Sequence, residues 1–255
     1  RWFDHYLKGI ENGEDKKPKA TYYVNGENQW HTSEDWMPKE ARLVNLYLDS
    51  DGHANSMNGD GRVTLTPAET GSDAYVYDPE FPCGGEGDGF DDGLVSPYKC
   101  NSRQIRSDVL VYDTPVLEQD IAIAGPLYAE LYAASSAVDT DFIVRVSDVD
   151  EQGTARNVSF NIIRAEFRKG WDKPELLTPG KIEKYEMEMY FYGMVFKKGH
   201  KIRIDISSSK LVEAFPNTNT GIDPYTDPKP IKATQTIYHG REYPSHVKLP
   251  VLYGL

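Results

Sequence analysis

The segment Ile202-Arg203-Ile204-Asp205-Ile206 decides the fold class, because apolar and charged residues alternate in it at every position. Successive side chains of a β-strand point to opposite faces of the sheet, so a period of two is typical of a strand with one buried face. The ranges 142–147 and 184–191 alternate in the same way. The sequence therefore predicts half-buried strands in all three places.

Weaker alternation extends this pattern over most of the chain. It occurs in the ranges 43–48, 75–77, 109–112, 121–132, 158–163 and 247–251, and turn-forming residues lie between them at 58–61, 151–153 and 178–180. Many short alternating strands without amphipathic helices between them indicate two antiparallel sheets packed face to face. We therefore expect an all-β protein, a β-sandwich or jelly roll, and not a doubly wound α/β fold.

The composition is that of a globular domain of 255 residues, with 39% hydrophobic and 27% charged residues. The 28 Lys and Arg residues face 40 Asp and Glu residues, which gives a net charge of -12. Binding to a nucleic acid backbone needs a concentrated basic surface, so we expect no nucleic-acid partner. Nor does any apolar stretch approach the roughly 18 residues of a membrane-spanning helix, so we expect no membrane function.

The first eight residues are the one place where the pattern favours a helix. Trp2, Phe3, Tyr6 and Leu7 share a face at helical spacing, and Gly9 ends the pattern. The segment has neither an initiator Met nor a leader pattern, so we expect the chain to be a piece of a longer protein whose compartment the sequence does not give. In such a piece the four apolar side chains are exposed, fold onto the β domain, or pair with a second copy of the chain.

The sequence offers little catalytic chemistry. It contains no Gly-x-Ser-x-Gly nucleophile elbow, and none of its six histidines has a partner at metal-ligand spacing. The segment 56–67 resembles a calcium loop but has Pro67 where the last carboxylate ligand belongs, so a tight Asn-Gly hairpin is the better interpretation. Asp139 and Asp141 are expected to bind backbone N–H groups at a strand entrance. We predict no catalytic residue, metal or cofactor.

The segment 78–106 is a long connection rich in Gly and acidic residues. Loops of this length in a compact domain are usually functional or disordered, so it is either a surface excursion or part of a substrate pocket. Cys83 and Cys100 lie in it and are too few for a zinc site. They form a disulfide or are two unrelated thiols, and their spacing does not decide between these alternatives.

An ordered set of short motifs covers nearly the whole chain, and together they resemble the cocaine esterase / X-Pro dipeptidyl-peptidase hydrolases. The motifs are Arg1-Trp2-Phe3-Asp4-His5-Tyr6-Leu7-Lys8-Gly9, Tyr75-Val76-Tyr77-Asp78-Pro79, Gly84-Gly85, Arg106-Ser107-Asp108-Val109-Leu110-Val111-Tyr112, Gly125-Pro126, Asp139-Thr140-Asp141-Phe142, Asp148-Val149, Pro179-Gly180, Gly199-His200-Lys201-Ile202-Arg203, Ser207-Ser208-Ser209, Asn219-Thr220-Gly221 and Pro244-Ser245-His246 with Leu249-Pro250.

This resemblance implies a jelly roll of galactose-binding-like topology, the C-terminal domain of a serine hydrolase. Residues 1–20 would be a helix and linker left from an α/β-hydrolase domain, and 21–255 the jelly roll, with 21–45 as a boundary segment. The Ser-Asp-His triad would lie in the hydrolase domain of the same polypeptide, and this chain alone would be inactive. A small ester or X-Pro peptide substrate would bind at the domain interface, where Phe90 and Leu94 are the candidate pocket residues.

A rival hypothesis is a free-standing module that binds carbohydrate or another ligand. Jelly rolls often hold sugars on exposed aromatic faces, and this chain has 17 Tyr and 4 Trp residues. Trp30, Trp36 and Trp171 are the candidate contacts. A role in the core is the commoner fate of such residues, so the hydrolase-domain hypothesis stays ahead.

Overall fold

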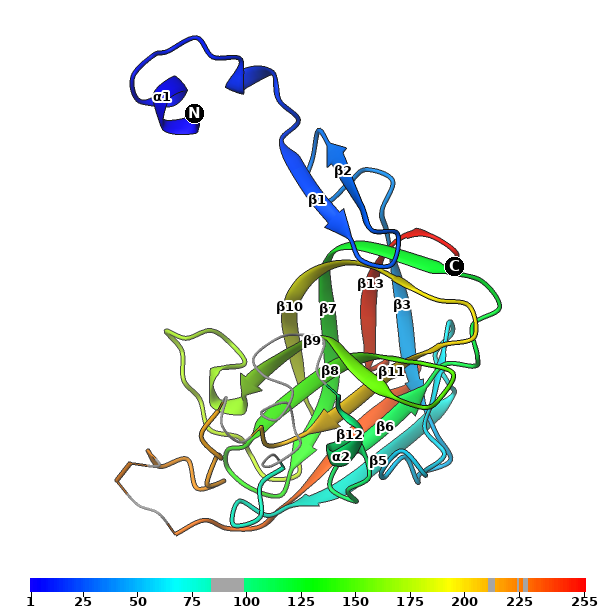
Figure 1. The fold of residues 1–255 in the computed structure, drawn as a ribbon. Helices are drawn as coiled ribbons and strands as arrows, with labels where there is room; N and C mark the ends of the chain where they lie inside the picture. Colours follow the sequence, from blue (N-terminus) through cyan, green and yellow to red (C-terminus); the bar gives the residue numbers. More distant parts are fainter. Residues whose placement is uncertain (84–98, 211–213, 224, 227–228) are drawn as a thin grey trace.

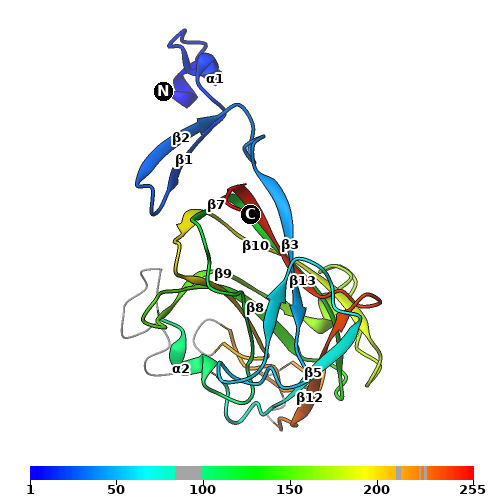
Figure 2. The ribbon, with the colours of Figure 1, turned by 90° about the vertical axis from the view of Figure 1, so that its right-hand side faces the viewer.

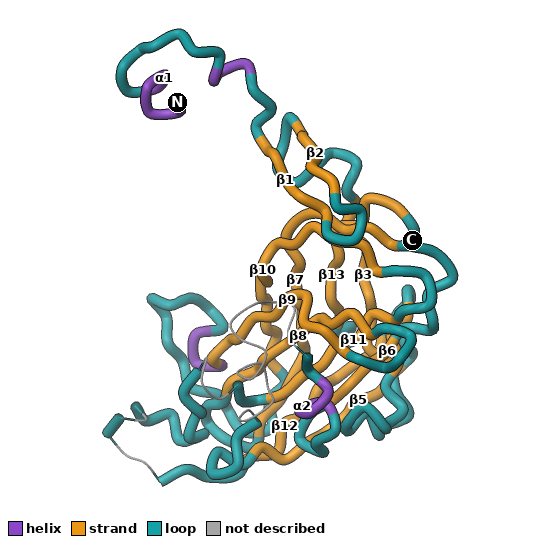
Figure 3. The backbone as a smooth tube through the Cα atoms, viewed as in Figure 1, coloured by secondary structure: helices purple, strands orange, loops and turns teal. Residues whose placement is uncertain are grey.

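A computed structural model of the chain describes residues 1–83, 99–210, 214–223, 225–226 and 229–255. Two parts are visible: a β body, and an N-terminal arm that leaves one end of it (Figures 1 and 2). The tube view shows that the regular structure of the body is almost entirely strand, whereas its helices are short (Figure 3). The all-β prediction is confirmed, while the finer jelly-roll topology stays a prediction.

The elements follow one another along the chain in this order: α1 (Trp2–Tyr6), the 3-10 helix η1 (Glu14–Lys16), β1 (Ala20–Val24), β2 (Gln29–Ser33), β3 (Arg42–Asp49), β4 (Arg62–Thr64), β5 (Thr70–Tyr77), α2 (Asn101–Gln104), β6 (Leu110–Asp113), β7 (Ile121–Ser135), β8 (Asp141–Val149), β9 (Ala155–Arg164), the 3-10 helix η2 (Ala165–Phe167), β10 (Glu183–Phe196), β11 (Lys201–Ser207), β12 (Ala233–Gly240) and β13 (His246–Tyr253).

The body is built from one long hydrogen-bonded path of strands within the described residues. Its order is β5-β12-β7-β13-β3-β4-β6-β11-β8-β9, and β10 pairs with β7 outside this path. The pairs are antiparallel except for a short parallel contact between β4 and β6. Strands from along the whole path, including β5 and β9 at its ends, contribute side chains to one interior.

A single large cluster of buried side chains fills this interior and receives residues from the eleven strands β3 to β13. Representative members, one from each strand, are Leu48, Val63, Tyr77, Tyr112, Ile123, Phe142, Val158, Tyr185, Ile204, Ile237 and Leu249. Burying a Val, Leu, Ile or Phe side chain contributes about 1.5–3 kcal/mol relative to leaving it exposed. The stability of the chain therefore resides in the body.

Strand β10 follows the period-two prediction as far as Met189, but its register shifts between Glu188 and Phe191, and Phe191, which was predicted to share the face of Tyr185, is exposed. Tyr185, Met187 and Met189 are buried in the core, whereas Glu186 and Glu188 are exposed. Strands β8 and β11 differ, because nearly all of their residues are buried on both faces. The prediction of half-buried strands is therefore wrong for these two.

The second face of β11 is covered by the short helix α2 and its polar side chains. The Gln104 amide donates to the Asp205 carboxylate (2.8 Å) and accepts a hydrogen bond from the Arg203 guanidinium (2.9 Å). Arg103 donates to the Ser207 hydroxyl (2.7 Å). The charged residues of the alternating pattern in β11 therefore lie in a buried polar layer and not in water. Their hydrogen bonds to α2 offset the hydration that they lose on burial.

The arm consists of α1, η1 and the hairpin formed by β1 and β2. It joins the body at the end of β1, where Val24 packs with Ala122 and Val195. The Asn25 N–H donates to the Gly193 carbonyl (2.9 Å), and the Val195 N–H donates to the Asn25 carbonyl (2.8 Å). The predicted boundary after residue 20 falls at the start of this hairpin, and the predicted boundary segment 21–45 ends within β3. The domain division itself stays a prediction.

The segment 50–61 is a loop between β3 and β4 and not the tight hairpin predicted from Asn58 and Gly59. It packs against β6, where the Val111 N–H donates to the Ala54 carbonyl (2.8 Å). A Cβ atom added at Gly61 would lie 2.0 Å from the Val111 carbonyl oxygen. The glycine therefore serves a close approach of two backbones and not a two-residue turn.

The two cysteines lie in separate buried clusters. Cys83 packs with Val109 and Val111, whereas Cys100 packs with Val149 and Ala155. The structure does not join the two thiols to each other, and the possible disulfide stays a prediction. Burial raises the pKa of the Cys100 thiol above its ordinary value. No helix in the described part of the chain is both long and apolar enough to cross a membrane.

Candidate functional site

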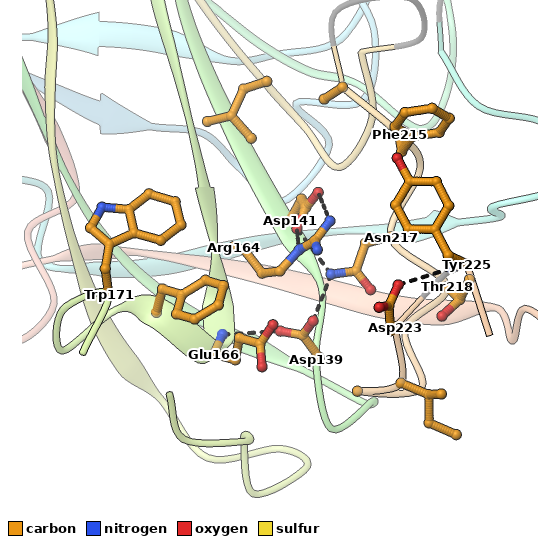
Figure 4. A pocket seen from close by; sticks show the side chains of 15 residues that line it. Asp139, Asp141, Arg164, Glu166, Trp171, Phe215, Asn217, Thr218, Asp223 and Tyr225 are labelled. Atoms are coloured by element: carbon orange, nitrogen blue, oxygen red, sulfur yellow. Dashed lines mark hydrogen bonds and ion pairs between the residues drawn. The ribbon is translucent and has the colours of Figure 1, made fainter. Parts of the chain in front are cut away.

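A pocket of about 670 Å³ opens where β8 begins and β9 ends. It lies between the turn that follows η2 and the segment 214–225 (Figure 4). Its described lining residues are Asp139, Asp141, Ile162, Arg164, Glu166, Phe167, Trp171, Ala214, Phe215, Asn217, Thr218, Gly221, Ile222, Asp223 and Tyr225. The pocket therefore combines acidic and aromatic side chains.

The floor of the pocket is a hydrogen-bonded polar network. The Asn217 amide donates to the Asp139 carboxylate (2.7 Å) and to the Asp141 carboxylate (2.9 Å). The Arg164 guanidinium donates to both oxygens of Asp141 (3.0 and 3.3 Å). Asp139, Asp141 and Asn217 are buried. Since each group holds its neighbours in place, the floor presents a fixed arrangement of oxygen atoms.

The entrance of β8 is anchored by the backbone as well. Asp139 accepts a hydrogen bond from the Glu166 N–H (3.0 Å) at the start of η2, and the Thr140 carbonyl accepts one from the Ala165 N–H (2.8 Å). The Thr140 hydroxyl accepts a hydrogen bond from the Gln235 amide (2.9 Å). The sequence-based expectation that these carboxylates bind backbone N–H groups thus holds for Asp139, although the donor is distant in the sequence.

Burial raises the pKa of Asp139 to about 6, and the neighbouring Asp141 carboxylate acts in the same direction. The hydrogen bond from Asn217 opposes this shift because it stabilises the charged form. Asp139 is consequently ionised for the most part at neutral pH and protonated in mildly acidic solution.

Aromatic side chains form two walls on opposite sides of this floor (Figure 4). Trp171 packs on Phe167 with ring centroids 4.8 Å apart, and Phe215 meets Tyr225 edge to face at 5.4 Å. Trp171 is nevertheless 83% exposed and Tyr225 76% exposed. The outer faces of these rings are therefore available for contact with another molecule.

The pocket lining described above contains no Ser, Cys or His side chain, so it lacks the usual nucleophiles and the usual general base. A Ser, a His and an Asp do meet inside the body, where Ser50 donates to Asp73 (2.7 Å) and lies 3.1 Å from His239 Nε2. The same Nε2 atom also faces Asp73 (3.2 Å). A catalytic triad needs the carboxylate on the other ring nitrogen and an accessible hydroxyl, so this buried group is structural.

The other predicted site residues have mixed outcomes. Phe90 and Leu94 lie outside the described residues. Trp30 contacts Tyr23, and Trp36 contacts Phe191, so both belong to the hairpin and its junction with β10. Trp171 is the tryptophan of the three that lines the pocket. Among the described residues no group of three or more His, Cys, Asp or Glu side chains is arranged to hold a metal ion.

Sequence reasoning singled out Asp139, Asp141 and Trp171 but missed Arg164, Asn217 and Tyr225. The missed residues come from the end of β9 and from a distant segment that contains both Asn217 and Tyr225, and they carry no local pattern. The one available signal for Asn217 was its place beside the motif Asn219-Thr220-Gly221.

Comparison with known proteins was made at the level of families, sequences and structures. The model of the X-Pro dipeptidyl-peptidase C-terminal non-catalytic domain matches residues 12–248. The cocaine esterase of Rhodococcus sp. is 32% identical over 256 residues, which cover 98% of this chain and 45% of that protein. A putative serine esterase of Mycobacterium bovis is 24% identical over 99% of this chain and 40% of its own length.

Solved structures agree with this comparison. An aminopeptidase from a marine sediment Thaumarchaeota archaeon matches with a TM-score of 0.82 and 25% identity, over 98% of this chain and 42% of its own. An alpha-amino acid ester hydrolase matches with a TM-score of 0.79 and 26% identity, over 98% and 43%. The chain thus spans less than half the length of each of these proteins, and the family predicted from its motifs is confirmed.

Proposed function

The chain belongs to the family of X-Pro dipeptidyl-peptidase C-terminal non-catalytic domains, and from this premise we propose that it packs on the catalytic domain of a serine hydrolase in the same polypeptide and helps to shape the substrate pocket. The hydrolase would act on a small ester or an X-Pro peptide through an acyl-enzyme. The chain alone would have no turnover.

The observation that carries this proposal is the exposed apolar face of the arm. Trp2, Phe3, Tyr6 and Leu7 are all more than half exposed, and α1 buries none of its side chains. The sequence left three outcomes open for these side chains: exposure, packing on the β domain, or pairing with a second copy. The structure has the first of them. Apolar surface concentrated on a projecting element is typical of an interface, and a catalytic domain is the partner that the family supplies.

Self-association through the same four side chains is the competing use of this surface. A second copy would have to associate from solution, whereas a catalytic domain in the same polypeptide is held beside the arm at high effective concentration. We therefore favour the catalytic domain as the occupant.

Phe90 and Leu94 remain the proposed pocket residues. The described residues on either side of them are anchored to the body: the Cys83 N–H donates to the Ser209 hydroxyl (2.6 Å), and the Cys100 N–H donates to the Ala155 carbonyl (2.9 Å). Firm anchoring of both flanks supports a positioning role, since a pocket wall must be held in place to orient a substrate.

The proposal is tested with the full polypeptide and with this chain alone, assayed on p-nitrophenyl butyrate. We expect turnover by the full polypeptide only. Phe90→Ala should lower kcat/KM by about tenfold, in the range that loss of an apolar pocket contact causes. Phe81→Ala, which alters an exposed phenylalanine on the anchored flank, is the matched control and should leave kcat/KM unchanged.

Two results would contradict the proposal. Ester hydrolysis by the isolated chain, abolished by a serine-directed fluorophosphonate, would place catalysis within it. Equal kcat/KM values for Phe90→Ala and the parent polypeptide would remove Phe90 from the pocket.

A further inference from the structure

The pocket at the start of β8 has a strong and one-sided charge. The described residues of its lining include four carboxylates, Asp139, Asp141, Glu166 and Asp223, and one cationic side chain, Arg164. These five groups together carry a formal charge of -3 when all are ionised. A pocket of this kind attracts cations and repels anions, and the effect is strengthened by the concave low-dielectric wall.

The aromatic walls add a second and independent preference. The exposed faces of Trp171 and Tyr225 are electron-rich, and a cation that lies over such a face is attracted by the ring quadrupole. Tryptophan is the most effective of the aromatic residues in this respect. The same faces also pack well against the apolar part of an organic molecule.

A bare metal ion does not fit this arrangement. The Asp139 and Asp141 carboxylates already accept hydrogen bonds from Asn217 and Arg164. The positive charge of the Arg164 guanidinium also repels a metal ion at the floor. A pocket of about 670 Å³ with aromatic walls suits a molecule of several carbon atoms.

We propose that this pocket binds organic cations, molecules that carry an ammonium group on an apolar body. The ammonium lies over the Trp171 face, in the negative field of the carboxylates that line the pocket. The apolar body lies between the Trp171 and Tyr225 walls, and the polar floor stays intact. This inference does not depend on the proposed role in a hydrolase, because the site is formed entirely by this chain.

The test uses the 255-residue chain and two probes of the same shape. Choline carries a quaternary ammonium, and 3,3-dimethylbutan-1-ol replaces its nitrogen by carbon. We expect ligand-observed NMR titration to show at least tenfold tighter binding of choline, and we expect added salt to weaken it, because a screened charge contributes less. Methyl β-galactoside serves as the carbohydrate probe and should bind more weakly than choline.

Variants locate the site. Trp171→Ala should weaken choline binding about fivefold, in the range of a cation–π contact, whereas Trp171→Phe should retain most of the affinity. Asp223→Asn keeps an oxygen for the hydrogen bond from the Tyr225 N–H and should weaken binding about twofold. Trp30→Ala removes an exposed tryptophan of the arm and should have no effect. Trp171 is exposed, so its replacement should leave the melting temperature unchanged.

Three results would overturn the inference: equal binding of choline and 3,3-dimethylbutan-1-ol, a preference for the galactoside, or no measurable binding of choline. Choline binding that Trp30→Ala abolishes and Trp171→Ala does not would also contradict it, because the cation would then bind the arm. None of these results bears on esterase turnover by the full polypeptide, so the two proposals can fail separately.

Discussion

The arm and the body treat their aromatic and aliphatic side chains in opposite ways. Helix α1 and the 3-10 helix η1 have no buried side chain, although α1 carries Trp2 and Phe3. In the body, β8 and β11 bury almost every residue, including charged ones such as Arg145 and Asp205.

This difference separates two kinds of apolar residue. Those of the body stabilise the fold of this chain, because they leave water when the chain folds. Those of helix α1 contribute little to its folding because they stay exposed, and they should add stability only when a partner covers them. The predictions that follow test this separation by comparing matched changes in the two regions.

The largest difference is expected for an aromatic residue of each region. Phe142 is fully buried in the core and packs against Tyr185 at 4.9 Å, so Phe142→Ala should lower the free energy of unfolding by about 3–5 kcal/mol. Trp2→Ala should change it by less than about 0.5 kcal/mol. Urea denaturation of the two variants measures both values. Similar losses in the two variants would end the distinction between arm and body.

A buried carboxylate should have the next largest effect. Burial on its own would raise the pKa of Asp73, but hydrogen bonds from His239, Ala54, Ser50 and Tyr112 outweigh it and leave the pKa below its ordinary value. The charged form therefore stabilises the fold above the pKa of the unfolded state, and this stabilisation is lost as the pH falls through the folded-state pKa.

We expect Asp73→Asn to lower the free energy of unfolding at pH 7 by about 3 kcal/mol, because it breaks a buried charged network. Asp51→Asn is the matched control: Asp51 pairs with Arg62 on the surface, where water screens the pair, so this change should lower the free energy of unfolding far less than Asp73→Asn. An equal loss of the free energy of unfolding in the two variants would show that the Asp73 network stabilises the fold no more than a surface ion pair does.

The smallest of these effects concerns the pH dependence at the pocket floor. The pKa of Asp139 is raised to about 6, so its contribution is fully present below the unfolded-state pKa and is lost as the pH rises through about 6. Between pH 4 and 6 the stability of the parent chain should fall by about 2 kcal/mol relative to Asp139→Asn, whose amide does not titrate. Thermal unfolding as a function of pH measures this, and parallel curves for the two proteins would contradict the pKa assignment.

The sequence was sufficient for the parts of the fold that depend on local periodicity. The first half of β10, as far as Met189, has its apolar residues on one face as predicted, because water covers the other face. β8 and β11 have the same period, but their charged residues meet polar partners inside the protein: Asp205 of β11 meets Gln104 of α2, and Asp141 of β8 meets Arg164. Alternation alone cannot distinguish a face that meets water from one that meets a buried polar partner.

The candidate pocket shows a second limit. Asp139 and Asp141 could be singled out because they stand together at a strand entrance. Asn217 and Arg164 complete the floor only after the chain has brought β9 and the segment 214–223 beside β8. Contacts between distant segments leave no local pattern in one sequence, and the geometry of the pocket therefore required the structure.

The central claim is that the arm is a covered interface in the full polypeptide and an exposed one in this chain. Hydroxyl-radical footprinting of Trp2, Phe3, Tyr6 and Leu7, in the isolated chain and in the same chain continuous with its catalytic domain, tests it most directly. The account predicts strong labelling of all four in the isolated chain and protection in the full polypeptide, while exposed Trp171 serves as the reference. Equal labelling of the arm in both proteins would contradict the claim.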